Sequence, residues 1–247
     1  MNPLFFTEPK EENKYRIFFF SYAGSGASIG LPYHRLLQPE IDLISIQLPG
    51  RENRIDEQPY DNIPSMIEPL LLAFIPYLDR PFYLWGHCSG ALIAYELLLK
   101  LQRFGSDANG FFVSACAAPT LANSILPVSF HQLSDEDFIE AIENLMKDSF
   151  TITHENSDTI KILLPTIRAD FGSYEQYQPT ADISLNCPIY AFSATQDQLV
   201  SHEAMSRWQH HTTQSFYLDE IPDEKHYFIN HRFEELSKKI KKIVLNT

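Results

Sequence analysis

The sequence contains few cysteines, few basic residues and no long apolar run. Three cysteines, Cys88, Cys116 and Cys187, form an odd count that favours reduced thiols over a disulfide framework. Lys and Arg number 19 against 32 Asp and Glu, and the net charge of −13 argues against a general nucleic-acid-binding protein. No run approaches the roughly 18 apolar residues of a membrane span, and the first residues lack the features of a secretion signal. We therefore expect a cytoplasmic globular protein.

The usual signatures of metal and phosphate sites are also missing. The cysteines lie 28 and 71 residues apart, which is not a zinc-ligand spacing, so we expect no metal and no other bound cofactor. The Gly/Ser-rich loop Tyr22–Ser28 lacks both G-x-G-x-x-G and the Lys-Ser/Thr pair of a phosphate-binding loop. Small residues do allow a backbone N–H to approach a substrate oxygen closely. The loop is therefore a candidate oxyanion hole, with the N–H of Ala23 as one donor.

Short apolar segments alternate with helical patterns along most of the 247 residues. The predicted strands are Tyr15–Ser21, Asp42–Leu48, Phe82–Trp85, Phe111–Ala117, Ile189–Ser193 and Ser215–Leu218. Apolar residues at helical spacing follow over 63–78, where three prolines make the helix irregular, and over 89–103. Strands alternating with helices predict an α/β fold, with a mostly parallel central sheet and helices on both faces.

The alternation stops between residues 119 and 180, where two helical patterns occur instead. The first begins at Ser134, a residue type that caps helices, and aligns Phe138 with Ile142. The second covers 160–171 and is interrupted by Pro165. We interpret this segment as a helical lid inserted into a single domain of residues 1–247. Ordinary crossover helices are the alternative interpretation.

Residues 86–90 read Gly-His-Cys-Ser-Gly and join a predicted strand to a predicted helix. In a nucleophile elbow, G-x-S-x-G, the central residue occupies a strained turn and the flanking glycines relieve crowding. The central residue here is Cys88, whereas a Ser89 nucleophile would need glycines at positions 87 and 91. Cys88 is therefore the candidate nucleophile, and the N–H of Ser89 is the second candidate oxyanion donor. A buried cysteine at a tight turn is the alternative.

A nucleophile of this kind needs a base and a group that orients the base. Asp197 follows one predicted strand and His226 follows the next, in the chain order nucleophile, acid, His that α/β-hydrolases use. We predict that His226 is the base and that Asp197 orients it. We expect His87 to point away from the site if Cys88 points into it. The weaker candidates are the histidines His202, His210 and His211 and the acids Asp219 and Asp223.

Several segments together resemble the type II thioesterases of polyketide and nonribosomal-peptide assembly lines. They are Phe20–Gly24, Gln47–Arg51, Gly86–Gly90, Leu163–Phe171 and the blocks around Asp197 and His226. The resemblance implies an α/β-hydrolase fold with a helical lid, and removal of stalled or wrong acyl groups from the phosphopantetheine arm of an acyl or peptidyl carrier protein. The family's triad would fall on position 88, Asp197 and His226, in agreement with the residues chosen above.

Cys88 departs from the family, which usually has serine at this position. Attack by a thiol exchanges one thioester for another, so the acyl-enzyme stays activated. We expect hydrolysis, with acyl transfer or cyclisation onto an amine, thiol or hydroxyl acceptor as the alternative. A non-catalytic module that binds carrier proteins is a second alternative. We expect a monomer, and we interpret the lysines at 238–242 as a solvated helix end rather than a docking patch.

Overall fold

The computed structural model describes residues 4–7, 10, 12–126, 129–146, 157–179 and 183–246. At its centre is a six-stranded sheet with the strand order β2-β1-β3-β4-β5-β6. The strands are β1 (Tyr15–Phe20), β2 (Ile41–Ser45), β3 (Phe82–His87), β4 (Gly110–Ser114), β5 (Ile189–Ala194) and β6 (Phe216–Ile221). Each neighbouring pair runs parallel, so the predicted sheet is confirmed and these six strands are parallel throughout.

Burial of the strands explains why their sequences are continuous apolar runs. All six residues of β3 are buried, as are the last five of β1, because helices cover both faces of a parallel sheet. Edge strand β6 instead mixes exposed and buried residues. From β1 the chain continues to β2 at one edge of the sheet, whereas from β3 it continues to β4 on the other side. The connections thus diverge between the neighbours β1 and β3, and a crevice is expected at the carboxyl ends of these two strands.

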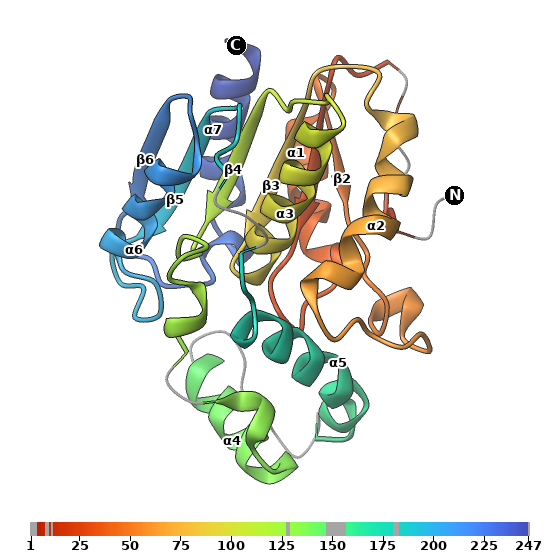
Figure 1. Ribbon diagram of the computed structural model, residues 1–247, viewed down its shortest axis with the longest axis vertical. Coiled ribbons are helices and arrows are strands. Elements are labelled where there is room, and N and C mark those ends of the chain that lie inside the picture. The colour runs from red at the N-terminus through yellow and green to blue at the C-terminus, as the bar shows by residue number, and fades with distance from the viewer. Residues whose placement is uncertain are drawn as a thin grey trace.

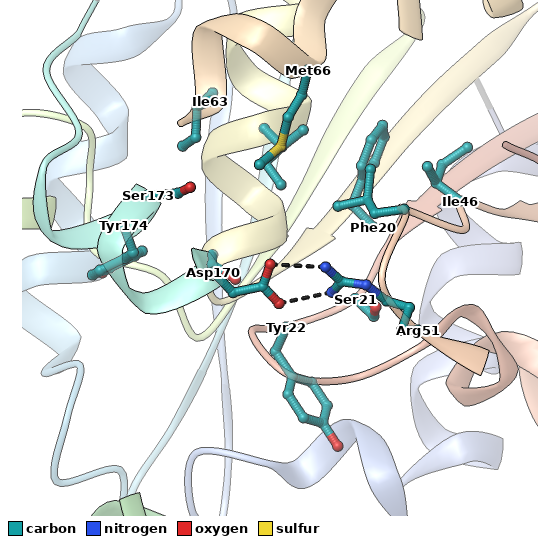
Figure 2. A pocket seen from close by; sticks show the side chains of 13 residues that line it. Phe20, Ser21, Tyr22, Ile46, Arg51, Ile63, Met66, Asp170, Ser173 and Tyr174 are labelled. Atoms are coloured by element: carbon teal, nitrogen blue, oxygen red, sulfur yellow. Dashed lines mark hydrogen bonds and ion pairs between the residues drawn. The ribbon is translucent and has the colours of Figure 1, made fainter. Parts of the chain in front are cut away.

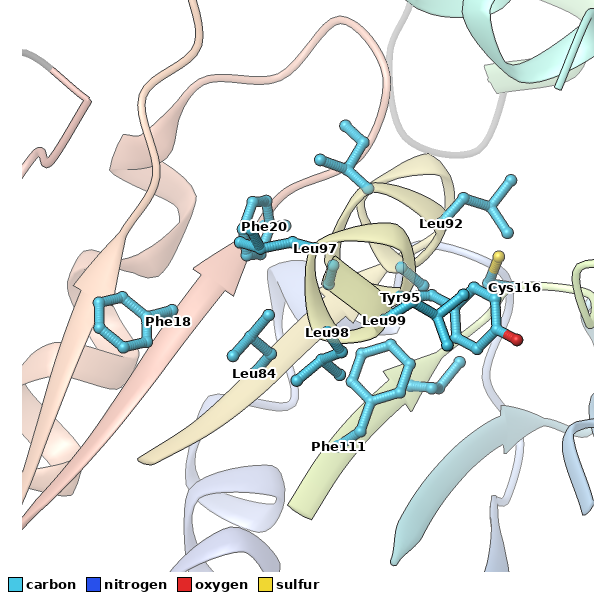
Figure 3. Close-up of a cluster of buried hydrophobic side chains, with 14 of the residues drawn as sticks. Phe18, Phe20, Leu84, Leu92, Tyr95, Leu97, Leu98, Leu99, Phe111 and Cys116 are labelled. Atoms are coloured by element: carbon cyan, nitrogen blue, oxygen red, sulfur yellow. The ribbon is translucent and has the colours of Figure 1, made fainter. Parts of the chain in front are cut away.

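Two layers of helices cover the sheet (Figure 1). One layer holds α2 (Ile63–Phe74), α3 (Ser89–Arg103) and α6 (His202–Ser206), and the other holds α1 (Leu31–Leu37) and α7 (Phe233–Leu245). Leucines of α3 meet apolar side chains of β3 and β4 in the core beneath the first layer (Figure 3). Helix α2 ends four residues before the predicted boundary and continues as a 3₁₀ turn, in which proline is the second residue. None of the described helices has the length and apolar character needed to cross a bilayer.

The predicted helices between β4 and β5 are α4 (Asp135–Met146) and α5 (Ser157–Glu175), and they lie beyond the carboxyl ends of the strands (Figure 1). The Asp137 N–H donates to Ser134 Oγ at 3.2 Å, which is the expected cap. Phe138 of α4 and Phe171 of α5 share an apolar cluster separate from those on the sheet faces. A core of their own is consistent with the lid interpretation.

Candidate active site

Cys88 occupies a strained turn between β3 and α3. Its backbone has φ 51° and ψ −126°, a conformation that costs free energy for any residue with a Cβ. A Cβ on Gly86 would lie 2.2 Å from Ala91 Cα, and one on Gly90 would lie 2.3 Å from the Ser21 carbonyl oxygen. Both flanking positions therefore require glycine, and the predicted elbow geometry is present at Cys88.

The His226 side chain is held by a buried carboxylate. Its Nδ1 lies 2.8 Å from Asp197 Oδ2, and the two side chains are only 6% and 1% exposed. The other oxygen, Asp197 Oδ1, accepts the N–H groups of Leu199 at 2.8 Å and Val200 at 3.0 Å. The carboxylate is thereby fixed in the loop after β5. It orients the imidazole so that Nδ1 donates to Asp197 and Nε2 remains for chemistry.

The charges around His226 favour its protonated form. Burial by itself lowers the pKa of His226, but the adjacent Cys88 sulfur and the Asp197 carboxylate outweigh it and raise the pKa to about 10. Nε2 is buried and has no hydrogen-bond partner of good geometry among the described residues. At neutral pH the imidazole therefore holds a proton beside Cys88 that it can give to a leaving group.

The rival acids and histidines lie elsewhere. Asp219 Oδ2 pairs with Lys239 Nζ at 2.6 Å, and Asp223 forms a turn in which its N–H donates to Thr195 Oγ1 at 2.8 Å. His202 is more than half exposed, 3.2 Å from a Glu220 oxygen, and the others, His210 and His211, belong to a 3₁₀ turn. In the part of the chain described, Asp197 is the acid that contacts His226.

His87 points away from Cys88, as predicted, and does not line the cavity around it. Its ring instead packs against the ring of His226. It is fully buried, its Nδ1 lies 3.0 Å from Ser114 Oγ, and its ring centroid is 5.5 Å from that of His226. Burial, together with the positive charge of His226, lowers the pKa of His87 well below its usual value. A neutral His87 therefore packs against a protonated His226, a contact that the sequence pattern did not predict.

The candidate oxyanion donors lie on two sides of Cys88. Ser89 begins α3, where helix geometry leaves the first N–H groups without intrahelical partners. Ala23 lies in the loop after β1, and its N–H has no acceptor among the described residues. One cavity, which spans about 430 Å³ with open solvent included, is lined by Ala23, Cys88, Ser89 and His226 and is here called the nucleophile cavity. Its remaining walls are apolar or aromatic, formed by Ile125, Leu126, Leu145, Phe171, Tyr174, Leu199, Val200 and Tyr227.

A buried ion pair connects the loops after β1 and β2 to helix α5. Arg51 Nη1 and Nη2 donate to the two oxygens of Asp170 at 2.7 and 2.9 Å, and both side chains are 7% exposed. Asp170 Oδ2 also accepts the N–H of Gly24 at 2.8 Å, while Arg51 donates to the Ser25 carbonyl at 3.2 Å. Arg51 and Asp170 belong to the segments that carry the family resemblance. Their pairing across 119 positions was not visible in the sequence.

The arrangement can perform nucleophilic acyl chemistry. A sulfur that can act as a nucleophile, an imidazole that holds or takes a proton and two residues with candidate N–H donors line one cavity, and a carboxylate outside its lining orients the imidazole. Among the described residues, no cluster of His, Cys, Asp or Glu side chains could hold a metal ion. Cys88, Cys116 and Cys187 are free thiols.

Comparison with known proteins identifies the family. The family described as the thioesterase domain matches residues 15–244. Linear gramicidin dehydrogenase LgrE of Brevibacillus parabrevis is 34% identical, with 89% of this chain and 84% of that protein covered. Gramicidin S biosynthesis protein GrsT of Aneurinibacillus migulanus is 33% identical, with 90% and 86% covered. The solved type II thioesterase BorB from the borrelidin biosynthetic cluster has a TM-score of 0.83 at 25% identity, with 95% and 93% covered. The chain therefore belongs to the thioesterase domain family and is a hydrolase that acts on thioesters.

Proposed function

We propose that this protein is a monomeric type II thioesterase that removes acyl groups from the phosphopantetheine arm of carrier proteins in a polyketide or nonribosomal-peptide pathway. The names of GrsT and BorB assign those relatives to gramicidin S and borrelidin biosynthesis, and the matches span most of each protein. One observation carries the proposal: Cys88 and His226 line the same largely apolar cavity, and Asp197 holds the His226 imidazole by a hydrogen bond.

In the first half of the reaction, Cys88 becomes acylated. Its Sγ, as the thiolate, attacks the thioester carbonyl carbon, and the N–H groups of Ala23 and Ser89 stabilise the negative charge on the carbonyl oxygen. The carbon–sulfur bond to pantetheine then breaks. The departing thiolate takes the proton from His226 Nε2, so free pantetheine thiol leaves and a neutral His226 remains beside the acyl-Cys88 thioester.

In the second half, water releases the acid. His226 Nε2 removes a proton from a water molecule as its oxygen attacks the acyl-Cys88 carbonyl, and Asp197 stabilises the imidazolium that forms. The bond to Cys88 Sγ breaks, which regenerates the thiolate beside protonated His226. The product is the free carboxylic acid, which loses its own proton to solvent. The buried Nδ1–Oδ2 contact of 2.8 Å holds His226 in place through both steps.

Acyl transfer is the second candidate, favoured by the identity of residue 88. Acylation of Cys88 exchanges a thioester for a thioester, so the intermediate retains its reactivity toward amines and thiols, whereas acylation of a serine would lose it. The name of LgrE indicates dehydrogenase chemistry for that relative alone. Cys88, His226 and Asp197 supply a nucleophile, a proton carrier and an orienting carboxylate, which suit acyl transfer to water or to another acceptor.

The test is to mix the protein with an acylated carrier protein and follow both species by intact mass. We expect free acid to be released by the wild type and by a Cys187→Ala variant, which removes a buried thiol outside the site. Cys88→Ala is expected to lose at least about 1,000-fold in rate. An acyl adduct on Cys88 that only an added amine or thiol discharges would instead support acyl transfer. Carrier binding without adduct or release would contradict both enzymatic functions.

A further inference from the structure

A second cavity, here called the distal cavity, adjoins the nucleophile cavity. It spans about 450 Å³, open solvent included, between the loop after β1, helices α2 and α3, and helix α5 (Figure 2). Ser89 and Tyr174 line both cavities, so the two cavities share a wall next to Cys88. The apolar lining of the distal cavity comes mainly from Phe20, Ile46, Leu48, Ile63, Met66 and Ile93.

The chemistry of the proposed thioesterase reaction assigns the two halves of the substrate to different sides of Cys88. The leaving pantetheine sulfur must lie beside His226, which protonates it. His226, Tyr227 and Leu199, from the loops after β5 and β6, line the nucleophile cavity and are absent from the walls of the distal cavity. The acyl chain leaves the reacting carbon in the other direction, which leads past Ser89 to the distal cavity.

Some polar groups in the wall of the distal cavity already have hydrogen-bond partners within the protein, and one does not. Arg51 and Asp170 form a bidentate pair, which neutralises both charges and disfavours a charged ligand. Ser173 is 5% exposed, and its Oγ has no hydrogen-bond partner among the described residues. A serine inside a helix usually bonds the carbonyl of the preceding turn, and Ser173 in α5 does not. Figure 2 shows its hydroxyl turned toward the space beside Ile63 and Met66.

We propose that the distal cavity binds the acyl chain and that Ser173 selects chains carrying a neutral oxygen substituent, a hydroxyl or a keto group. A buried hydroxyl without a partner is unfavourable, and an oxygen on the acyl chain supplies that partner. An unsubstituted chain still fills the apolar walls but leaves Ser173 unpaired. This inference rests on the thioesterase function proposed above and names its substrate class.

The test measures kcat/KM for octanoyl-pantetheine and for hydroxyoctanoyl-pantetheines with the hydroxyl on the third, fifth or seventh carbon, together with the corresponding keto compounds. We expect Ser173→Ala to lower kcat/KM about 3- to 10-fold for one or more oxygenated chains. The value for octanoyl-pantetheine should stay within about twofold of wild type. Ser173→Thr keeps a hydroxyl and should retain the preference. Ser237→Ala is the matched control, because Ser237 Oγ in α7 is also buried without a partner but lies outside both cavities.

A second variant tests where the chain lies without depending on Ser173. Met66→Phe enlarges a side chain in the wall of the distal cavity, and we expect it to lower kcat/KM for octanoyl-pantetheine about tenfold relative to acetyl-pantetheine. Equal effects on the two chain lengths would overturn the location, and an unchanged preference in Ser173→Ala would overturn the role of Ser173. If the wild type hydrolyses none of these thioesters, the proposed function itself fails, and this inference fails with it.

Discussion

The His226 imidazole is buried against two side chains whose electrostatics favour its protonated form, those of Cys88 and Asp197. Burial favours the neutral ring, whereas both neighbours favour the protonated ring, and the neighbours prevail. The proton that acylation requires is therefore already on His226 before substrate arrives.

The first prediction concerns this proton. In Cys88→Ala and Cys88→Ser we expect the pKa of His226 to fall well below 10, because the charge of the sulfur is lost while burial continues to lower the pKa. Titration of the imidazole resonances by NMR measures the pKa directly. The two variants differ in size and polarity but neither carries the charge, so they should agree. A pKa that stays near 10 in both would show that Asp197 alone protonates the ring.

The second prediction concerns Asp197. Asp197→Asn keeps the shape of the side chain but removes the carboxylate that orients His226 and stabilises its charge. We expect the rate of thioester cleavage to fall about 100- to 10,000-fold, measured as release of pantetheine thiol. Asp219→Asn is the control, because Asp219 pairs with Lys239 on the surface and should leave the rate unchanged. Equal losses in the two variants would argue against the assignment of Asp197.

At the scale of elements, α5 is joined to the loop after β1 by a buried charge pair. Asp170 on α5 binds Arg51 through both of its oxygens and also accepts the N–H of Gly24, the residue after Ala23. A displacement of α5 would therefore pull on the loop that holds Ala23, the candidate oxyanion donor. This connection links the position of α5 to the geometry around Cys88.

The third prediction tests that connection. Asp170→Asn leaves Arg51 buried without a charged partner, so we expect the free energy of unfolding to fall by about 3–5 kcal/mol, measured by urea denaturation. Asp135→Asn is the control: Asp135 of α4 pairs with Arg168 of α5, but its side chain is 68% exposed, so its loss should cost at most about 1 kcal/mol. A loss for Asp170→Asn no larger than that of its control would show that the buried pair contributes little.

For the whole molecule, the net charge of −13 governs how it meets other proteins. The lysines of α7 do not form an unpaired basic patch. Lys239 pairs with Asp219, Lys241 lies 3.0 Å from a Glu40 oxygen, and Lys238 lies 4.0 Å from a Glu234 oxygen. These contacts support the interpretation of this segment as a helix end with local ion pairs.

The fourth prediction follows from this charge. Carrier proteins of these pathways are mostly acidic, so their encounter with this protein is repulsive at low salt. We expect kcat/KM for an acylated carrier protein to rise with ionic strength between about 0.01 and 0.15 M, as the screening length falls from about 30 to about 8 Å. Acyl-pantetheine carries no net charge, so its kcat/KM should change little. A value that falls with salt for the carrier would reveal a basic docking patch.

The local features of this protein were predictable because each depends on neighbouring residues. An apolar run bounded by turn residues becomes a buried strand wherever it lies in the chain, so β1, β3 and β5 were predicted to within about two residues at each end. The elbow at Cys88 needs Gly86 and Gly90, and both requirements are visible within five positions. The short helix α1 was not predicted, because seven residues provide too few turns for a helical period.

The sequence by itself determined the parallel α/β fold, and it pointed to Cys88 as the candidate nucleophile and, through the order of residues after successive strands, to His226 and Asp197. Only the tertiary structure decided which of three acids meets His226, that His87 packs behind it, and that Arg51 joins Asp170. The reason is physical. Strand and turn formation depends on residues close in the chain, whereas these contacts arise when loops from separate strands meet at one edge of the sheet.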